Sequence, residues 1–240
     1  MLFFKSNKLI IFDINQFSFF KFIYTKIMSV KSLVYKVPGI SFDIDRLIDT
    51  YQEIIQKKKF DQGDGSVSHI DSISLNRIPG NEDSTKGKFS WGLYWTKPDQ
   101  SGQEKSRAHH IDEKKFTEFL PEFENTYFKY VYETLSKRYA LGRTRILKKG
   151  PRSTLSWHRD PELRLHIPII TNPGCRFVIE DRSFHLPADG HAWIVNAKKY
   201  HNFFNGGEED RIHLVATLPY SKLFDDKKNN FDQFWHTWGH

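Results

Sequence analysis

The sequence predicts an α+β fold in which helices precede a β-sandwich or jelly roll, and three observations favour it. Residues 44–55 carry apolar side chains at the spacing of one helix face. After Gly142 the pattern changes to short apolar segments separated by Gly, Pro, Asn and Asp. The chain has 240 residues, of which 38% are hydrophobic and 15% aromatic, which suits one well-buried domain better than two. We therefore expect a single β core supported by helices.

The elements before Gly142 are expected in the following order. A short strand at residues 33–35 is ended by a turn at Pro38-Gly39. Asp43 then caps the helix of residues 44–55. Further on, the pattern predicts a strand over residues 70–78 and a mostly helical region over residues 113–141 that is interrupted around Pro121.

The region after Gly142 carries the strands of the expected core. Short strands at this spacing are typical of sandwiches and jelly rolls. They are predicted at residues 143–147, 154–158, 165–170, 177–179, 183–186, 192–195, 201–205 and 212–218.

The domain prediction places one unit at residues 28–220, with 28–144 as helical buttress and substrate loops and 145–218 as jelly-roll core. Residues 1–27 are rich in Phe, Ile and Lys, but no uninterrupted apolar stretch reaches the ~20 residues that cross a bilayer. Met28 begins a segment typical of a protein start, so we expect residues 1–27 to be a dispensable leader or an over-long start; a membrane-surface anchor is the alternative. Residues 221–240 are expected to be a tail.

Charge and cysteine content narrow the partners and the compartment. The formal charge of +7 arises from 36 basic and 29 acidic residues, and the lysines are scattered rather than gathered in a stripe. We therefore expect neither a nucleic-acid partner nor a membrane partner. Cys175 is the only cysteine, which excludes an intrachain disulfide and a cysteine-based zinc site. A reducing, cytoplasmic location is the default expectation.

Three residues in a His-x-Asp … His order form the candidate metal site. His158 and Asp160 are two positions apart, so at a strand or its end both side chains project to the same side. His201 comes from a later strand that a jelly roll can bring alongside. Two imidazoles and one carboxylate on one face of an ion are typical of non-haem Fe(II) oxygenases, although zinc or manganese could use the same ligands.

Arg211, ten positions after His201, is the candidate residue for a dicarboxylate co-substrate. A guanidinium grips a carboxylate through two parallel hydrogen bonds, which suits 2-oxoglutarate. The acidic run at residues 208–210 offers a different interpretation, in which Arg211 belongs to a surface ion pair. Its neighbours alternate like a core strand, however, so we expect its side chain to point inward, where it needs a carboxylate. The hypothesis from these residues is an Fe(II)- and 2-oxoglutarate-dependent hydroxylase.

Residues from about 145 to 217 resemble the aspartyl/asparaginyl β-hydroxylase family of 2-oxoglutarate oxygenases. The matching elements are His158, Arg164-Leu165-His166 with Ile167-Pro168-Ile169, Gly174-Cys175, Gly190, His201 and the segment from Arg211 to Val215. The resemblance implies a double-stranded β-helix with ligands at His158 and His201. It also implies that Arg211 binds 2-oxoglutarate and that Arg164 and His166 lie near co-substrate or substrate. Animal members lack the carboxylate ligand, so Asp160 makes this chain more similar to bacterial proline-hydroxylase-like members.

The resemblance implies hydroxylation of an amino acid, free or as a residue in a peptide, with O₂ consumed and succinate and CO₂ released. Arg164 and Arg145 are extra cations that could bind a substrate carboxylate. Loops around residues 91–95 and 109–110 could close over the site, or the tryptophans could simply pack against the helices. The alternative function is a non-catalytic binding protein, or a metal-dependent cupin such as an isomerase that needs no 2-oxoglutarate.

Overall fold

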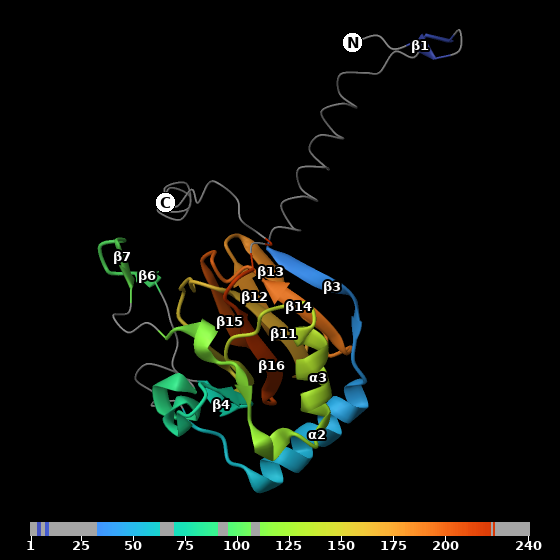
Figure 1. Cartoon of the computed structure of the whole chain (residues 1–240). Helices are drawn as coiled ribbons and strands as arrows, with labels where there is room; N and C mark the ends of the chain where they lie inside the picture. Colours follow the sequence, from blue (N-terminus) through green and yellow to red (C-terminus); the bar gives the residue numbers. More distant parts are fainter. Residues whose placement is uncertain are drawn as a thin grey trace.

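The computed structural model describes residues 4–5, 8–9, 33–62, 70–90, 96–106, 111–221 and 223. Its core consists of two antiparallel sheets that face each other (Figure 1). The larger sheet has six strands in the order β3 (Val34–Ser41), β14 (His191–Val195), β11 (Leu163–Ile170), β16 (Arg211–Leu218), β9 (Thr144–Lys149) and β4 (Asp71–Ser74). The smaller has four, in the order β10 (Ser153–Thr154), β15 (His201–Asn205), β12 (Cys175–Ile179) and β13 (Arg182–Phe184). This is the predicted jelly roll, or double-stranded β-helix.

Two helices, α2 (Ile44–Lys57) and α3 (Tyr127–Ser136), pack against the outer face of the six-stranded sheet (Figure 1). Asp43 caps α2 as predicted, because its carboxylate accepts hydrogen bonds from the amides of Asp45 and Arg46 at 3.1 and 3.2 Å. The buried side chains of both helices belong to one apolar cluster with the outward-facing residues of the sheet.

The two central strands, β11 and β16, are buried on both faces for nearly their whole length. In each strand the residues that face the helices are apolar, such as Leu165 and Leu214. The alternate residues face the space between the two sheets and include Arg164, His166 and Arg211. Because a buried polar group is costly without a partner, these inward residues mark the part of the core that serves function.

The remaining described elements are small. Among the described residues, no helix is long and apolar enough to cross a membrane. The small two-stranded pairs are β1 (Phe4–Lys5) with β2 (Lys8–Leu9), β5 (Asn76–Arg77) with β8 (Glu118–Phe119), and β6 (Thr96–Pro98) with β7 (Glu104–Ser106). The 3-10 helices are η1 (Glu82–Thr85), η2 (Gly87–Phe89), η3 (Glu113–Lys115) and η4 (Pro121–Phe123).

The predicted turn at Pro38-Gly39 is wrong, because β3 continues through both residues to Ser41. Its pairing with β14 shifts register between His191 and Trp193, so the chain bulges there instead of turning back. Gly39 has a φ of 69°, a left-handed conformation that glycine adopts readily. The sheet edge accommodates Pro38, which lacks an amide hydrogen.

The helical prediction for residues 113–141 holds only for α3. Before it lie η3, β8 and η4, because Glu113 is tied to a core strand and the amide of Leu120 bonds to the carbonyl of Leu75 at 2.9 Å. Pro121 at the start of η4 cannot continue a helix from residue 120. The helix-like apolar spacing arises because this irregular segment also buries phenylalanines, including Phe116 and Phe123.

Two predicted strands are shorter than expected. The strand predicted at residues 154–158 is reduced to β10, and His158 forms only an isolated bridge with His201. The strand predicted at residues 70–78 is divided into β4 and β5 at Leu75, whose amide bonds to the carbonyl of Thr144. The other strands predicted after Gly142 are present, with bounds that differ by a few residues.

Candidate functional site

The structure brings His158, Asp160 and His201 together at one end of the space between the sheets. One ligand atom from each residue lies within 4.8 Å of the other two. The three side chains are buried, with 3%, 5% and 5% of their surface exposed. The two imidazole rings have centroids 4.4 Å apart. Such a cluster has the donor set that the sequence predicted for a divalent ion.

Backbone hydrogen bonds hold these residues in place. The amide of His158 donates to the carbonyl of His201 at 3.0 Å, and the amide of His201 donates to the carbonyl of His158 at 2.7 Å. The amide of Asp160 donates to the carbonyl of Ala197 at 2.7 Å. The segment after β10 is therefore hydrogen-bonded to the turn before β15 and to the start of β15. This pairing brings His158 and Asp160 next to His201, although they are distant in the sequence.

The ring nitrogens of both histidines have distinct roles. Nδ1 of His158 lies 2.6 Å from the carbonyl oxygen of Ser156, and Nδ1 of His201 lies 2.9 Å from that of Lys199. A carbonyl only accepts, so each Nδ1 carries the hydrogen and each Nε2 presents a lone pair. Burial, together with the neighbouring His158, lowers the pKa of His201 to about 4. The lowered pKa favours the neutral imidazole of His201, which is the form that binds a metal.

Asp160 offers one oxygen to a metal and uses the other for an ion pair. Its Oδ2 lies 3.1 Å from Nη2 of Arg164, whose other terminal nitrogen lies 3.6 Å from Glu162. Its buried Oδ1 has no hydrogen-bond partner among the described residues. Burial alone would lower the pKa of Arg164, but Asp160 and Glu162 raise it above its ordinary value. Arg164 therefore lies against the candidate ligand rather than standing free for a second molecule.

Arg211 lies in the same interior and is 3% exposed, so the surface ion pair considered from the sequence is not formed. Its guanidinium carbon is 3.9 Å from the ring centroid of Phe203 and 5.5 Å from that of Phe177. Its Nη2 lies 2.5 Å from Nδ1 of His213, and its buried Nε has no hydrogen-bond partner within the described part of the chain. Burial lowers the pKa of Arg211 to about 9. The residue is thus a buried cation without a described carboxylate beside it.

His166 and His213 line the space between the candidate ligands and Arg211. Their rings are 5.7 Å apart, and His166 also contacts Phe177 edge-on at 4.9 Å. Burial and the adjacent Arg211 lower the pKa of both histidines well below the ordinary value. Nδ1 of His166 and Nε2 of His213 are buried without a hydrogen-bond partner among the residues described. Neutral, unsatisfied imidazoles here are suited to a polar ligand.

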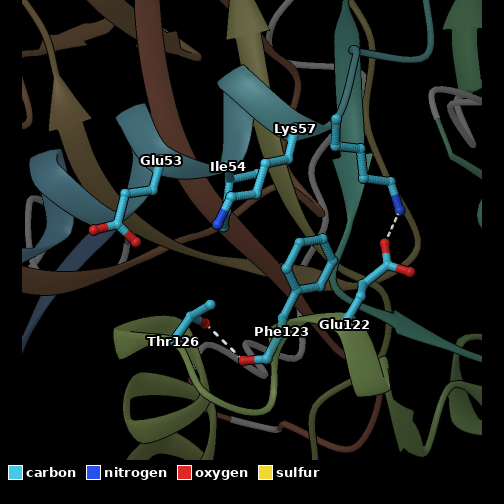
Figure 2. A pocket seen from close by; sticks show the side chains of 7 residues that line it. Glu53, Ile54, Lys57, Glu122, Phe123 and Thr126 are labelled. Carbon is cyan, nitrogen blue, oxygen red and sulfur yellow. Dashed lines mark hydrogen bonds and ion pairs between the residues drawn. The ribbon is translucent and has the colours of Figure 1, made fainter.

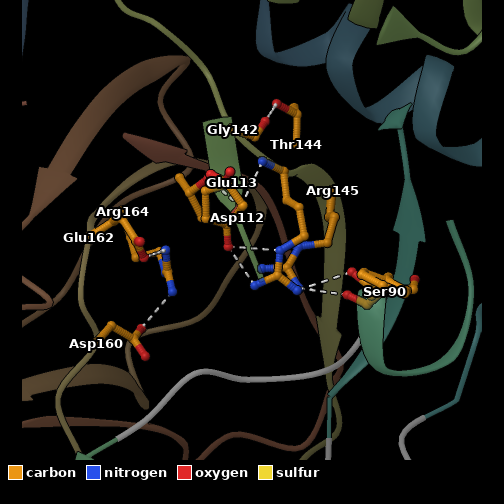
Figure 3. A network of polar contacts seen from close by, with 12 residues as sticks. Ser90, Asp112, Glu113, Gly142, Thr144, Arg145, Asp160, Glu162 and Arg164 are labelled. Carbon is orange, nitrogen blue, oxygen red and sulfur yellow. Dashed lines mark hydrogen bonds and ion pairs between the residues drawn. The ribbon is translucent and has the colours of Figure 1, made fainter. Parts of the chain in front are cut away.

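A second group of buried charges includes Glu113 of η3, on which the charge of Arg164 also acts (Figure 3). Glu113 accepts hydrogen bonds from the backbone amide and Nε of Arg143 at 3.0 and 2.8 Å, and from the hydroxyl of Thr217 at 2.8 Å. Burial would raise the pKa of Glu113, but Arg143, Arg164 and Arg145 together outweigh it and lower the pKa to about 2. Next to this pair, Arg145 donates from Nη1 to the carbonyl of Ser90 at 2.5 Å.

The β6–β7 hairpin is bonded to the two backbone segments that carry the candidate ligands. Glu104 on β7 accepts two hydrogen bonds from Arg159, at 2.8 and 2.7 Å, and one from the hydroxyl of Tyr200 at 2.8 Å. Thr96 on β6 exchanges two backbone hydrogen bonds of 2.9 Å with Arg159. Arg159 stands between His158 and Asp160 in the sequence, and Tyr200 directly precedes His201. The hairpin and the candidate ligands therefore share the same short stretches of backbone.

A separate pocket of about 330 Å³ lies between α2 and the segment around η4 (Figure 2). It contains none of the residues predicted for the site. An ion pair between Lys58 and Glu122 stands at this pocket. Its lining consists of Glu53, Ile54, Lys57, Lys58, Glu122, Phe123 and Thr126.

The family model of aspartyl/asparaginyl β-hydroxylases matches residues 85–219, more than half of the chain. The chain belongs to this family. By family it is a hydroxylase of the oxygenase type. The matched region spans the site from η2 to the end of β16 and includes every predicted site residue. A search of curated proteins finds no match.

The solved structures that the chain matches share little sequence with it. One is an oxidoreductase of the 2OG-Fe(II) oxygenase family from Burkholderia pseudomallei, with a TM-score of 0.42 and 14% identity over 80% of this chain and 86% of that one. Another is a Pseudomonas putida prolyl-4-hydroxylase, with a TM-score of 0.41 and 9% identity over 77% of this chain and 91% of that one. A third is a predicted oxalate decarboxylase from Thermotoga maritima, with a TM-score of 0.29 and 16% identity over 36% of this chain and 71% of that one.

Sequence reasoning did not single out His213, Glu113 or Glu104 as site residues. His213 could have been found, because it is two positions from Arg211 on a strand and so shares its face. Glu113 and Glu104 carry no such signal, since their partners come from distant elements. The predicted loop residues 91–95 and 109–110 lie outside the described residues, as do residues 10–27 and most of the expected tail.

Proposed function

We propose that the protein is an Fe(II)- and 2-oxoglutarate-dependent dioxygenase that hydroxylates an amino acid, free or as a residue in a peptide, and releases succinate and CO₂. One observation carries this proposal. The buried group His158, Asp160 and His201 shares its interior with Arg211, a buried cation that has no acidic partner among the described residues. A metal and a dicarboxylate would together satisfy both features.

His158, Asp160 and His201 would hold the metal through two Nε2 atoms and Oδ1. Two neutral nitrogens and one carboxylate oxygen bind one face of an ion and leave the opposite face open, which suits Fe(II). When bound, the iron supplies the oxygen activation that couples decarboxylation of 2-oxoglutarate to hydroxylation of a substrate C–H bond. The chain orients the ligands: the carbonyls beside each Nδ1 fix the imidazoles, and Arg164 fixes Asp160.

Arg211 would bind the far carboxylate of 2-oxoglutarate, with His213 and His166 beside it. The guanidinium is already oriented by His213 and by the ring of Phe203, so little conformational freedom remains to be lost on binding. The aromatic rings of Phe177 and Phe203 keep the surroundings apolar, which strengthens a charge pair formed there.

The decisive experiment is iron-dependent release of succinate from 2-oxoglutarate, measured on the purified chain. We expect release with Fe(II), 2-oxoglutarate and O₂, and its loss in His201→Asn. His191→Gln serves as matched control, because His191 is half-buried and interacts with Asp189 away from the three ligands. Metal binding without any effect of 2-oxoglutarate would instead indicate a cupin of another activity. Absence of metal binding would indicate a non-catalytic protein.

A further inference from the structure

Arg145 is a second buried cation that the proposed iron and 2-oxoglutarate leave without an anion. Its side chain is 2% exposed, and its Nη1 donates to the carbonyl of Ser90. Its Nε is buried without a hydrogen-bond partner, and none of the ion pairs between described residues includes it. Glu113 and Asp160 act on its charge, but neither is bonded to it. A buried guanidinium whose hydrogen bond goes to a neutral carbonyl is costly for the fold, which makes Arg145 a candidate for binding a ligand.

The position of Arg145 is close to the chemistry. On the larger sheet Val215 of β16 is paired with Arg145 on one side and with His166 on the other. Side chains of such cross-strand neighbours project to the same face, so Arg145 and His166 both face the space between the sheets. The charges that act on Arg145 include those of Arg164 and Asp160, one of the candidate metal ligands. Figure 3 shows Arg145 together with Arg164 and Asp160 in one close view.

The charges of the described interior leave room for one more anion. Lys149, the cross-strand neighbour of Arg211, is also buried, and the opposite charge that acts on it is that of Asp71. Beside that pair, four guanidiniums and three carboxylates meet in the interior: Arg143, Arg145, Arg164 and Arg211 with Glu113, Asp160 and Glu162. Ion pairs join Arg143 to Glu113, and Arg164 to both of the other carboxylates. A divalent ion and a doubly charged co-substrate would cancel each other. Arg211 would then be satisfied by the co-substrate, and Arg145 would remain.

The guanidinium of Arg145 is held in position by Ser90, which a cluster of buried serines fixes in turn. The hydroxyl of Ser90 lies 2.6 Å from that of Ser72 and 3.3 Å from that of Ser74, and all three serines are buried. This cluster ties the end of η2 to β4 and so places the carbonyl of Ser90 against Nη1. The edge of the guanidinium that carries Nε has a hydrogen-bond donor available for another partner. A pre-oriented edge of this kind suits a carboxylate, which accepts two parallel hydrogen bonds.

We propose that Arg145 binds a carboxylate of the substrate itself, so that the substrate is a carboxylic acid anchored beside the metal centre. This rests on the proposed function and narrows its substrate class. The carboxylate could be the free α-carboxylate of an amino acid, the C-terminus of a peptide, or an acidic side chain. The chemistry is the same for all three. Arg164, which the sequence offered for this task, is already paired with Asp160 and Glu162.

Binding to the Mn(II)- and 2-oxoglutarate-loaded protein tests the proposal without turnover. The ligands are the free L-amino acids against their carboxamides, short peptides with free against amidated C-termini, and peptides with Asp or Glu against Asn or Gln. We expect at least one acid to bind about thirtyfold more tightly than its amide, which corresponds to about 2 kcal/mol. Which of the three comparisons shows the difference identifies the source of the carboxylate.

The variant Arg145→Gln should bind acid and amide alike while its affinity for 2-oxoglutarate stays unchanged. Arg176→Gln is the matched control, because Arg176 is bonded to Ser183 on the smaller sheet. The proposal is overturned if no acid binds, if acids and amides bind the wild type equally, or if Arg145→Gln keeps the preference. The first two results need only the wild type, so they test the proposal even if the variant misfolds. A wild type that binds no 2-oxoglutarate would overturn the proposed function, and this inference with it.

Discussion

Replacing Arg211 by Met should weaken 2-oxoglutarate binding and leave the stability of the ligand-free protein unchanged or higher. Removing one partner of a buried charge pair costs about 2–5 kcal/mol, which is a rise in Kd of roughly thirtyfold to several thousandfold. Among the described residues, the guanidinium is next to His213 and the rings of Phe203 and Phe177 and has no acidic partner. A desolvated cation–π contact contributes about 2 kcal/mol, whereas a buried unpaired charge costs several. These two contributions to the free energy of unfolding nearly cancel, or their sum makes the variant more stable.

Two measurements on the same samples separate this explanation from a structural one. Calorimetric titration of the Mn(II)-loaded protein gives the Kd for 2-oxoglutarate, and thermal unfolding without ligands gives the change in stability. If Arg211 serves the fold instead, Arg211→Met would lower the melting temperature and leave the Kd unaltered. That combination would refute the reasoning, and it would also require an acidic partner for Arg211 that the described residues do not supply.

Two further predictions concern the groups around the metal ligands. Arg164→Met should lower the affinity for Mn(II) about 10- to 100-fold, because Arg164 orients Asp160. A Mn(II) titration measures this, with Arg176→Gln as the control variant. Equal Mn(II) affinities of the two variants would contradict the prediction. Glu113 has a folded pKa of about 2 against an ordinary 4.5, so its carboxylate stabilises the fold above pH 4.5, and that contribution is lost as the pH falls toward 2. The loss should be on the order of 3 kcal/mol in urea unfolding, and Glu113→Gln should lack this part of the pH dependence; parallel curves for the two proteins would count against it.

Local periodicity accounts for what the sequence predicted correctly about the fold. The strands after Gly142 are short, apolar and separated by turn residues, and α2 has a capping Asp43 and one apolar face. Residues 113–126 misled the prediction because burial of Phe116, Phe119 and Phe123 gives helix-like spacing without a helix. In that segment long-range bonds from Glu113 and Leu120 prevail over local preference.

The candidate site shows the same division between local and long-range information. The His-x-Asp pair, His201 and Arg211 were recognisable because residue type and spacing alone suggest a ligand set. The partners of the arginines were not, because they depend on strand register and on packing. Nothing in the sequence tells that Arg164 meets Asp160 whereas Arg145 meets the carbonyl of Ser90.

The reciprocal backbone bonds between His158 and His201 bear on how the centre behaves when it is emptied and refilled. The two imidazoles are fixed to one another by main-chain atoms and by carbonyls at each Nδ1, none of which takes part in coordination. Chelation should therefore strip the ion without unravelling the surrounding strands. Refilling would then require no ordering of the histidines, and Mn(II), Co(II) or Zn(II) should be accepted as well as Fe(II). Selectivity for iron would lie in the supply of metal ions in the cell and in the chemistry each ion can perform, not in a cage built for one of them.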